Sequence, residues 1–146
     1  MIRALKAFFP AVLLAYVLGT ALATQMILGN VQELGLAVSL TDRAAATLHD
    51  IMGMASSYLL LILVAFIFAL PVAAALARWM PAQRALLFAM AGFAGIVALH
   101  LIMKALLGVT GVAATRTLAG LLGQGVAGAV GGLCFHWLSR PSGGGA

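Results

Sequence analysis

The chain has 146 residues, of which 64% are hydrophobic and 8% are charged, and its formal net charge is +5. Soluble domains carry about 25% charged residues, so a soluble fold of this length could not cover its own surface. The long uncharged apolar runs instead predict an all-α integral membrane protein. The eight basic residues are scattered singly, without a basic run, and this argues against a nucleic-acid-binding protein.

Four segments are long enough to cross a hydrocarbon core about 30 Å thick, which needs roughly 20 apolar residues at 1.5 Å each. They are residues 8–28, 57–76, 86–107 and 118–138. We expect a single membrane domain over residues 1–146, built as a four-transmembrane-helix bundle with a flexible tail at 139–146. The first segment has a basic start and an Ala21-Leu22-Ala23 triplet, which also imitate a cleavable signal peptide. We interpret it as a retained helix.

The external segment 30–55, between the first two spans, is the only substantial polar stretch. A helix capped at Thr41 would carry apolar residues on one face: Ala44, Leu48, Ile51 and Met52. The opposite face would carry polar residues: Asp42, Arg43, His49 and Asp50. This pattern predicts a short amphipathic helix that lies on the outer face of the bundle.

Basic residues mark the cytoplasmic side of a membrane protein. With the N-terminus inside, the inner side holds Arg3, Lys6, Arg78, Arg84 and Arg140. The outer side holds Arg43, Lys104 and Arg116. Trp79 and Trp137 would both lie at the inner boundary, where amphipathic rings are enriched. We expect both termini in the cytoplasm, and the compact loops and Ala- and Gly-rich spans are typical of a prokaryotic inner-membrane protein.

Small residues recur at intervals of four within the spans, and this spacing lets helix backbones approach closely in lipid. In the last span one row at this interval is Arg116, Gly120, Gln124, Gly128, Gly132, His136 and Arg140. We expect these helix-packing residues: Ala15, Gly19, Ala69, Ala73, Gly120, Gln124, Gly128, Gly132 and His136. Gln124 and His136 should hydrogen-bond to a neighbouring helix, because water is absent there.

No cofactor or metal is expected. Residues 123–128 match the pattern G-x-G-x-x-G, but a dinucleotide-binding site needs a strand before that motif, and these glycines lie inside a span. His100 and His136 should differ in depth by about 15 Å, which is too far for both to ligate one haem iron. The single Cys134 excludes a multi-cysteine metal site.

A cluster of polar residues can gather at the outer end of the bundle. Its members come from the ends of three spans and the external segment: His49, Asp50, Tyr58, His100, Lys104 and Arg116. Ionisable residues within a span are functional candidates by default. Alternatively, Lys104 simply extends to the interface and the acids neutralise nearby bases.

These features predict a small non-enzymatic subunit of a homo-oligomer or of a larger membrane complex, because four helices offer more small-residue faces than one bundle uses. Its partners would be the lipid bilayer and either itself or another membrane protein. One alternative is a transporter or channel for a small or amphipathic solute, using the pocket near His100 and Lys104. A membrane enzyme or electron-transfer subunit is the second alternative.

Overall fold

The computed structural model of the protein describes residues 2–140, whose only regular elements are helices and which contain no strand. The α-helices are α1 (Ile2–Glu33), α2 (Leu40–Gly53), α3 (Tyr58–Trp79), α4 (Arg84–Leu107) and α5 (Leu118–Leu138). Two short 3-10 helices, η1 (Pro81–Gln83) and η2 (Ala113–Arg116), precede α4 and α5. The all-α class is therefore confirmed for these residues, whereas most of the expected tail, residues 141–146, lies outside them.

Among the described residues, four helices are long and apolar enough to cross a membrane: α1, α3, α4 with the preceding η1, and α5. The bounds of α5 equal those expected for the last span, and α3 and α4 begin and end within three residues of the expected positions. The first helix differs, because α1 has 32 residues. At 1.5 Å per residue it is about 48 Å long and exceeds a hydrocarbon core of about 30 Å.

The start of α2 differs from the expected cap at Thr41. The Ser39 hydroxyl accepts a hydrogen bond from the Asp42 backbone N–H at 3.0 Å, and the Asp42 carboxylate accepts one from the Ser39 N–H at 2.9 Å. This reciprocal capping box needs an acidic or amide side chain three residues after the cap. Thr41 is followed at that spacing by Ala44, so only Ser39 can form it. The external segment also begins later than expected, because residues 30–33 belong to α1.

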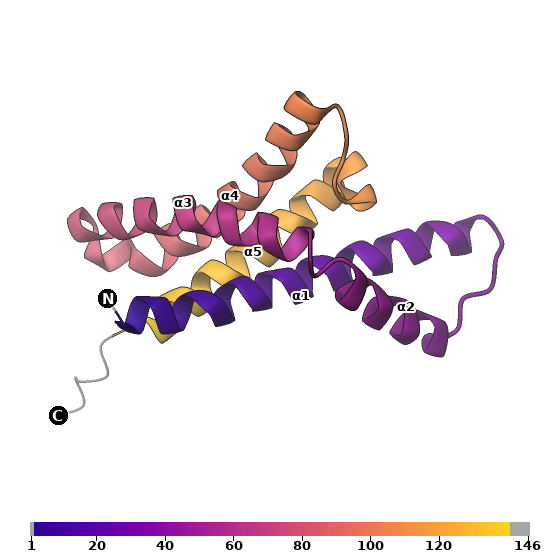
Figure 1. Cartoon of the computed structure of the whole chain (residues 1–146), viewed down its shortest axis with the longest axis horizontal. Coiled ribbons are helices and arrows are strands. Elements are labelled where there is room, and N and C mark those ends of the chain that lie inside the picture. Colours follow the sequence, from indigo (N-terminus) through magenta and orange to yellow (C-terminus); the bar gives the residue numbers. More distant parts are fainter. Residues whose placement is uncertain (1, 141–146) are drawn as a thin grey trace.

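Helix α2 folds back along the C-terminal half of α1, and together they form a helical hairpin that projects from the other helices (Figure 1). Its polar side faces α1: Arg43 donates to the side-chain oxygens of Gln25 at 2.6 Å and Gln32 at 2.5 Å. Thr24 donates to the Asp50 carboxylate at 2.7 Å. The polar groups at the end of α1 therefore hold Arg43 and Asp50, whereas Asp42 and His49 of the expected polar face are exposed.

Two large apolar residues of α2 lie on its outer side. Leu48 is 58% exposed and Met52 is 66% exposed, whereas Ile51 is partly buried. The Ile51 carbonyl accepts a hydrogen bond from the Tyr16 hydroxyl of α1, which anchors the end of α2 to the remaining helices.

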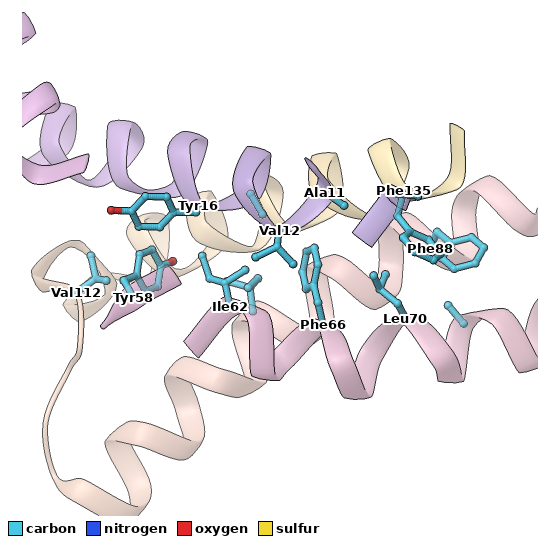
Figure 2. Close-up of a cluster of buried hydrophobic side chains, with 14 of the residues drawn as sticks. Ala11, Val12, Tyr16, Tyr58, Ile62, Phe66, Leu70, Phe88, Val112 and Phe135 are labelled. Atoms are coloured by element: carbon cyan, nitrogen blue, oxygen red, sulfur yellow. The ribbon is translucent and has the colours of Figure 1, made fainter. Parts of the chain in front are cut away.

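Helix α5 is the central element of the remaining packing, because it contacts both α1 and α4, and α3 contacts α4 and α1 (Figure 1). Aromatic side chains fill the interior along its length. Figure 2 shows Tyr16 of α1 near Tyr58 of α3, with 6.1 Å between ring centroids. Further along, Phe88 of α4 contacts Phe135 of α5, with 5.2 Å between centroids. Phe66 of α3 lies between these two pairs and is fully buried.

Candidate functional site

The glycine row of α5 packs against the backbone of α4. A Cβ atom placed on Gly128 would overlap the Gly92 carbonyl, and one on Gly132 would overlap the Phe88 carbonyl. Gly92 in turn faces the carbonyl of Gly128. A backbone carbonyl within a helix cannot rotate away as a side chain does, so these positions require glycine. The close approach places the two helices in direct backbone contact, as small-residue rows do in lipid.

A second face of α5 packs against α1. A Cβ atom on Gly131 would lie 2.8 Å from both the Ala11 carbonyl oxygen and the Ala15 Cβ. At the start of α5, Gly120 lies against the Ala114 carbonyl of η2. The glycines of α5 other than Gly123 are thus covered by residues of the same chain, and the row that contains Gly120, Gly128 and Gly132 is not free to meet a partner.

The small residues of α3 divide between the interior and the surface. Ala73 is buried in the core. Ala69 instead lines an apolar groove between α3 and α4, together with Gly95, whose Cβ position lies 3.0 Å from the Ala69 Cβ.

His136 does not form the expected hydrogen bond to a neighbouring helix. Its Nε2 accepts from Arg140 Nε at 2.9 Å, one turn further along the same chain. The ring lies 6.0 Å from the Phe88 ring of α4, between centroids, and its Nδ1 has no hydrogen-bond partner within residues 2–140. The expectation was wrong because the side of α4 that faces His136 presents an aromatic ring.

Gln124 is the centre of a buried hydrogen-bond network that joins three helices. The Tyr58 hydroxyl of α3 donates to Gln124 Oε1 at 2.5 Å, and Gln124 Nε2 donates to the Gly19 carbonyl of α1 at 2.8 Å. The Gln124 side chain is 1% exposed. Gly19 permits this approach, since a Cβ there would lie 2.6 Å from Gln124 Oε1. The network satisfies a polar side chain where water is excluded.

His100 of α4 extends this network to the fourth long helix. Its Nε2 lies 3.3 Å from the Tyr58 hydroxyl oxygen. Because that hydroxyl gives its proton to Gln124, it can only accept from His100, so Nε2 carries the proton in the neutral ring. The other nitrogen, Nδ1, is then an acceptor. It is buried and has no donor among the residues that the structure describes.

Three of the six residues expected in the external pocket line one hollow: His100, Lys104 and Arg116. Its volume is about 210 Å³, and it lies between the end of α4, the loop before α5 and the first turn of α5. An adjoining hollow of about 480 Å³ shares Lys104, Arg116 and Thr110 with it. Arg116 Nε donates to the Thr110 hydroxyl at 3.2 Å, which fixes the guanidinium at the rim.

The other three expected pocket residues lie elsewhere. Tyr58 belongs to the buried network behind His100. Asp50 accepts from Thr24 in the α1–α2 hairpin, and His49 is exposed on α2. His49 and Asp50 were wrongly placed in the pocket, because α2 folds along α1 and does not cover the loop between α4 and α5.

Three further polar residues that line this hollow were not predicted from the sequence, namely Thr110, Thr115 and Thr117. The available signal was the concentration of three threonines around Arg116 in a short loop. The contact of Gly92 with Gly128 was not predicted either, because it depends on how α4 and α5 are rotated about their axes.

Within residues 2–140, no group of three or more His, Cys, Asp or Glu side chains could hold a metal ion. No protein-family model, curated protein or solved structure matches the chain. Any functional proposal therefore rests on the geometry of the helices, the groove and the hollow.

Proposed function

We propose that the chain is an integral membrane protein that crosses the bilayer four times. The support is an arrangement suited to lipid, with the Tyr58–Gln124 network inside and large apolar side chains outside, such as Phe68, which is 70% exposed. The 22 residues of α3 measure about 33 Å, close to the thickness of a hydrocarbon core. Polar groups buried among helices with apolar groups facing outward are favoured where the solvent is acyl chain.

The proposed orientation places both termini on the cytoplasmic side. The start of α1, the α3–α4 turn and the end of α5 lie at the same end of the molecule (Figure 1). Arg84 donates to the Ser139 hydroxyl at 3.4 Å, which joins the start of α4 to the end of α5. This end holds five basic residues, Arg3, Lys6, Arg78, Arg84 and Arg140, and basic residues accumulate on the cytoplasmic side.

Within the membrane, the proposed role is that of a non-enzymatic subunit in a homo-oligomer. The observation that carries this proposal is the groove between α3 and α4, which has a volume of about 610 Å³. Small residues from both helices line it, namely Ala65, Ala69, Ala91, Ala94, Gly95 and Ala98. The glycine row of α5 is covered within the chain, but this groove is open. Small residues on a lipid-facing surface allow a further helix to approach closely, and a second copy of the chain is the occupant we propose.

The test compares oligomeric state before and after the groove is filled. Ala94 and Ala98 are exposed in the groove, so the double variant Ala94→Leu/Ala98→Leu should convert the oligomer to a monomer without unfolding the chain. The matched control is Ala74→Leu, an exposed alanine of α3 outside the groove. The measurement is the number of photobleaching steps per liposome at low protein density. A monomeric wild type, or an oligomer that survives the double substitution, would contradict the proposal.

One observation favours the transporter alternative, namely the hollow at His100 and Lys104. All of its lining residues come from residues 100–121, and none comes from α1 or α3. This arrangement supports binding at the outer end and offers no support for a path through the bundle. Uptake into liposomes that is abolished by His100→Ala would nevertheless favour transport.

A further inference from the structure

The hollow lined by His100, Lys104 and Arg116 concentrates positive charge that the chain itself does not neutralise. The three acidic residues of the chain are Glu33, Asp42 and Asp50, and none occurs after residue 50. Asp42 is engaged by Ser39, and Asp50 accepts from Thr24. The side chains of Lys104 and Arg116 therefore have no carboxylate partner on the elements that form the hollow.

The donors at this place have the geometry of an anion site. The Nε of Arg116 is held by Thr110 at 3.2 Å, and this leaves both terminal NH₂ groups of the guanidinium for a ligand. A guanidinium presents parallel donors that match two oxygens of a phosphate. The hollow also contains Thr117 and Leu118, the cap and first residue of the 21-residue helix α5. The N-terminus of a helix carries a partial positive charge that favours anions.

His100 also lines the hollow, and one of its ring nitrogens is buried without a partner among the described residues. This nitrogen is Nδ1, and the His100 side chain is 4% exposed. A buried acceptor without a donor is costly unless a bound group or water satisfies it.

We propose that this hollow binds a phosphate group, which Arg116 and Lys104 contact through their side-chain nitrogens and the start of α5 stabilises through its dipole. Lys104 lies three residues before the outer end of α4, at the level where lipid headgroups meet water in the proposed orientation. The phosphate can therefore come from the headgroup of an anionic phospholipid or from free phosphate in solution. The site requires no second copy of the chain, so it does not depend on the proposed oligomer.

The experiment uses the full chain in an uncharged maltoside detergent and two probes, inorganic phosphate and dioctanoyl phosphatidylglycerol, titrated by calorimetry. The variants are Arg116→Gln and Lys104→Gln. Both side chains are exposed, so their replacement should leave the fold intact, and thermal unfolding checks this. The matched control is Arg78→Gln, which removes the same charge from an exposed position in the last turn of α3. This position lies at the other end of the molecule from the hollow (Figure 1).

We expect saturable binding of at least one probe, with affinity reduced about tenfold by either substitution in the hollow and unchanged by Arg78→Gln. Binding of phosphatidylglycerol alone would assign the site to a lipid headgroup. Binding of inorganic phosphate, in competition with the lipid, would assign it to a free anion. The proposal is overturned if neither probe binds saturably, or if Arg78→Gln weakens binding as much as Arg116→Gln, since that would reflect general attraction to a basic protein.

Discussion

Two glycines of α5 that differ in surroundings allow a direct test of backbone contact between α4 and α5. Gly128 faces the Gly92 carbonyl and the Ile96 side chain, whereas a Cβ atom on Gly123 would meet nothing within 4 Å. Both lie within the same helix, so Gly→Ala has the same intrinsic effect on helix formation at each, about 1 kcal/mol in favour of alanine.

The expected difference follows from the contacts at Gly128. Gly123→Ala should leave the protein equally stable or stabilise it by up to about 1 kcal/mol. Gly128→Ala forces α4 and α5 apart, and overpacking of this kind costs about 1–3 kcal/mol. Because the gain in helix propensity is common to both positions and cancels, the two variants should differ by about 1–3 kcal/mol in their free energies of unfolding.

The assay is unfolding by dodecyl sulfate in mixed micelles, followed by the fluorescence of Trp79 at the end of α3 and Trp137 at the end of α5. Gly92→Ala provides a reciprocal check, because its Cβ would overlap the Gly128 carbonyl. The double variant Gly92→Ala/Gly128→Ala should cost less than the sum of the two single changes, since the first already separates the helices. Equal unfolding midpoints for Gly123→Ala and Gly128→Ala would refute direct contact between the two backbones.

Two further predictions concern the buried network and the start of α2. Gly19→Ala places a methyl group 2.6 Å from the Gln124 amide oxygen and should destabilise the protein by about 1–3 kcal/mol. Gly29→Ala on the same helix has nothing within 4 Å and should leave the protein equally stable or stabilise it by up to about 1 kcal/mol in the same mixed-micelle assay. Equal effects of the two changes would argue against the network. Hydrogen bonds from the Ser39 side chain and backbone lower the pKa of the exposed Asp42 carboxyl. The ionised carboxylate should therefore stabilise α2 fully at pH values above the ordinary carboxyl pKa. This stabilisation should be lost as the pH falls through the lowered pKa. Hydrogen exchange in the first turn of α2 should accelerate over that acidic range in the wild type and not in Ser39→Ala, and a pH-independent difference between the two proteins would contradict the linkage.

The ends of the helices show how far hydropathy predicts the fold. The apolar run of α5 is bounded by Arg116 and Arg140, so its length could be read directly from the sequence. Hydropathy falls after residue 28, yet α1 continues to Glu33. It continues because its polar residues pair with α2, and it ends before Gly35, whose φ of +84° is readily adopted by glycine.

The polar residues of the site were only partly predictable. The position of Gln124 in a glycine row indicated that it packs inward. Its two partners, Tyr58 and Gly19, are 66 and 105 residues away in the sequence, so no local pattern identifies them. The hollow at Lys104 and Arg116 was partly expected because both residues flank one short loop.

The sequence alone determined the all-helical class and the location of the four long apolar helices, because hydrophobicity over about 20 residues is a local property. A periodicity of 3.6 residues also places the small residues of each helix on common faces. Only the tertiary structure decided which helix each face meets. The rotation of α5 turned Gly128 toward α4 and Gly131 toward α1, and the polar end of α1 turned the polar face of α2 inward. These outcomes depend on contacts between distant segments, which no local pattern contains.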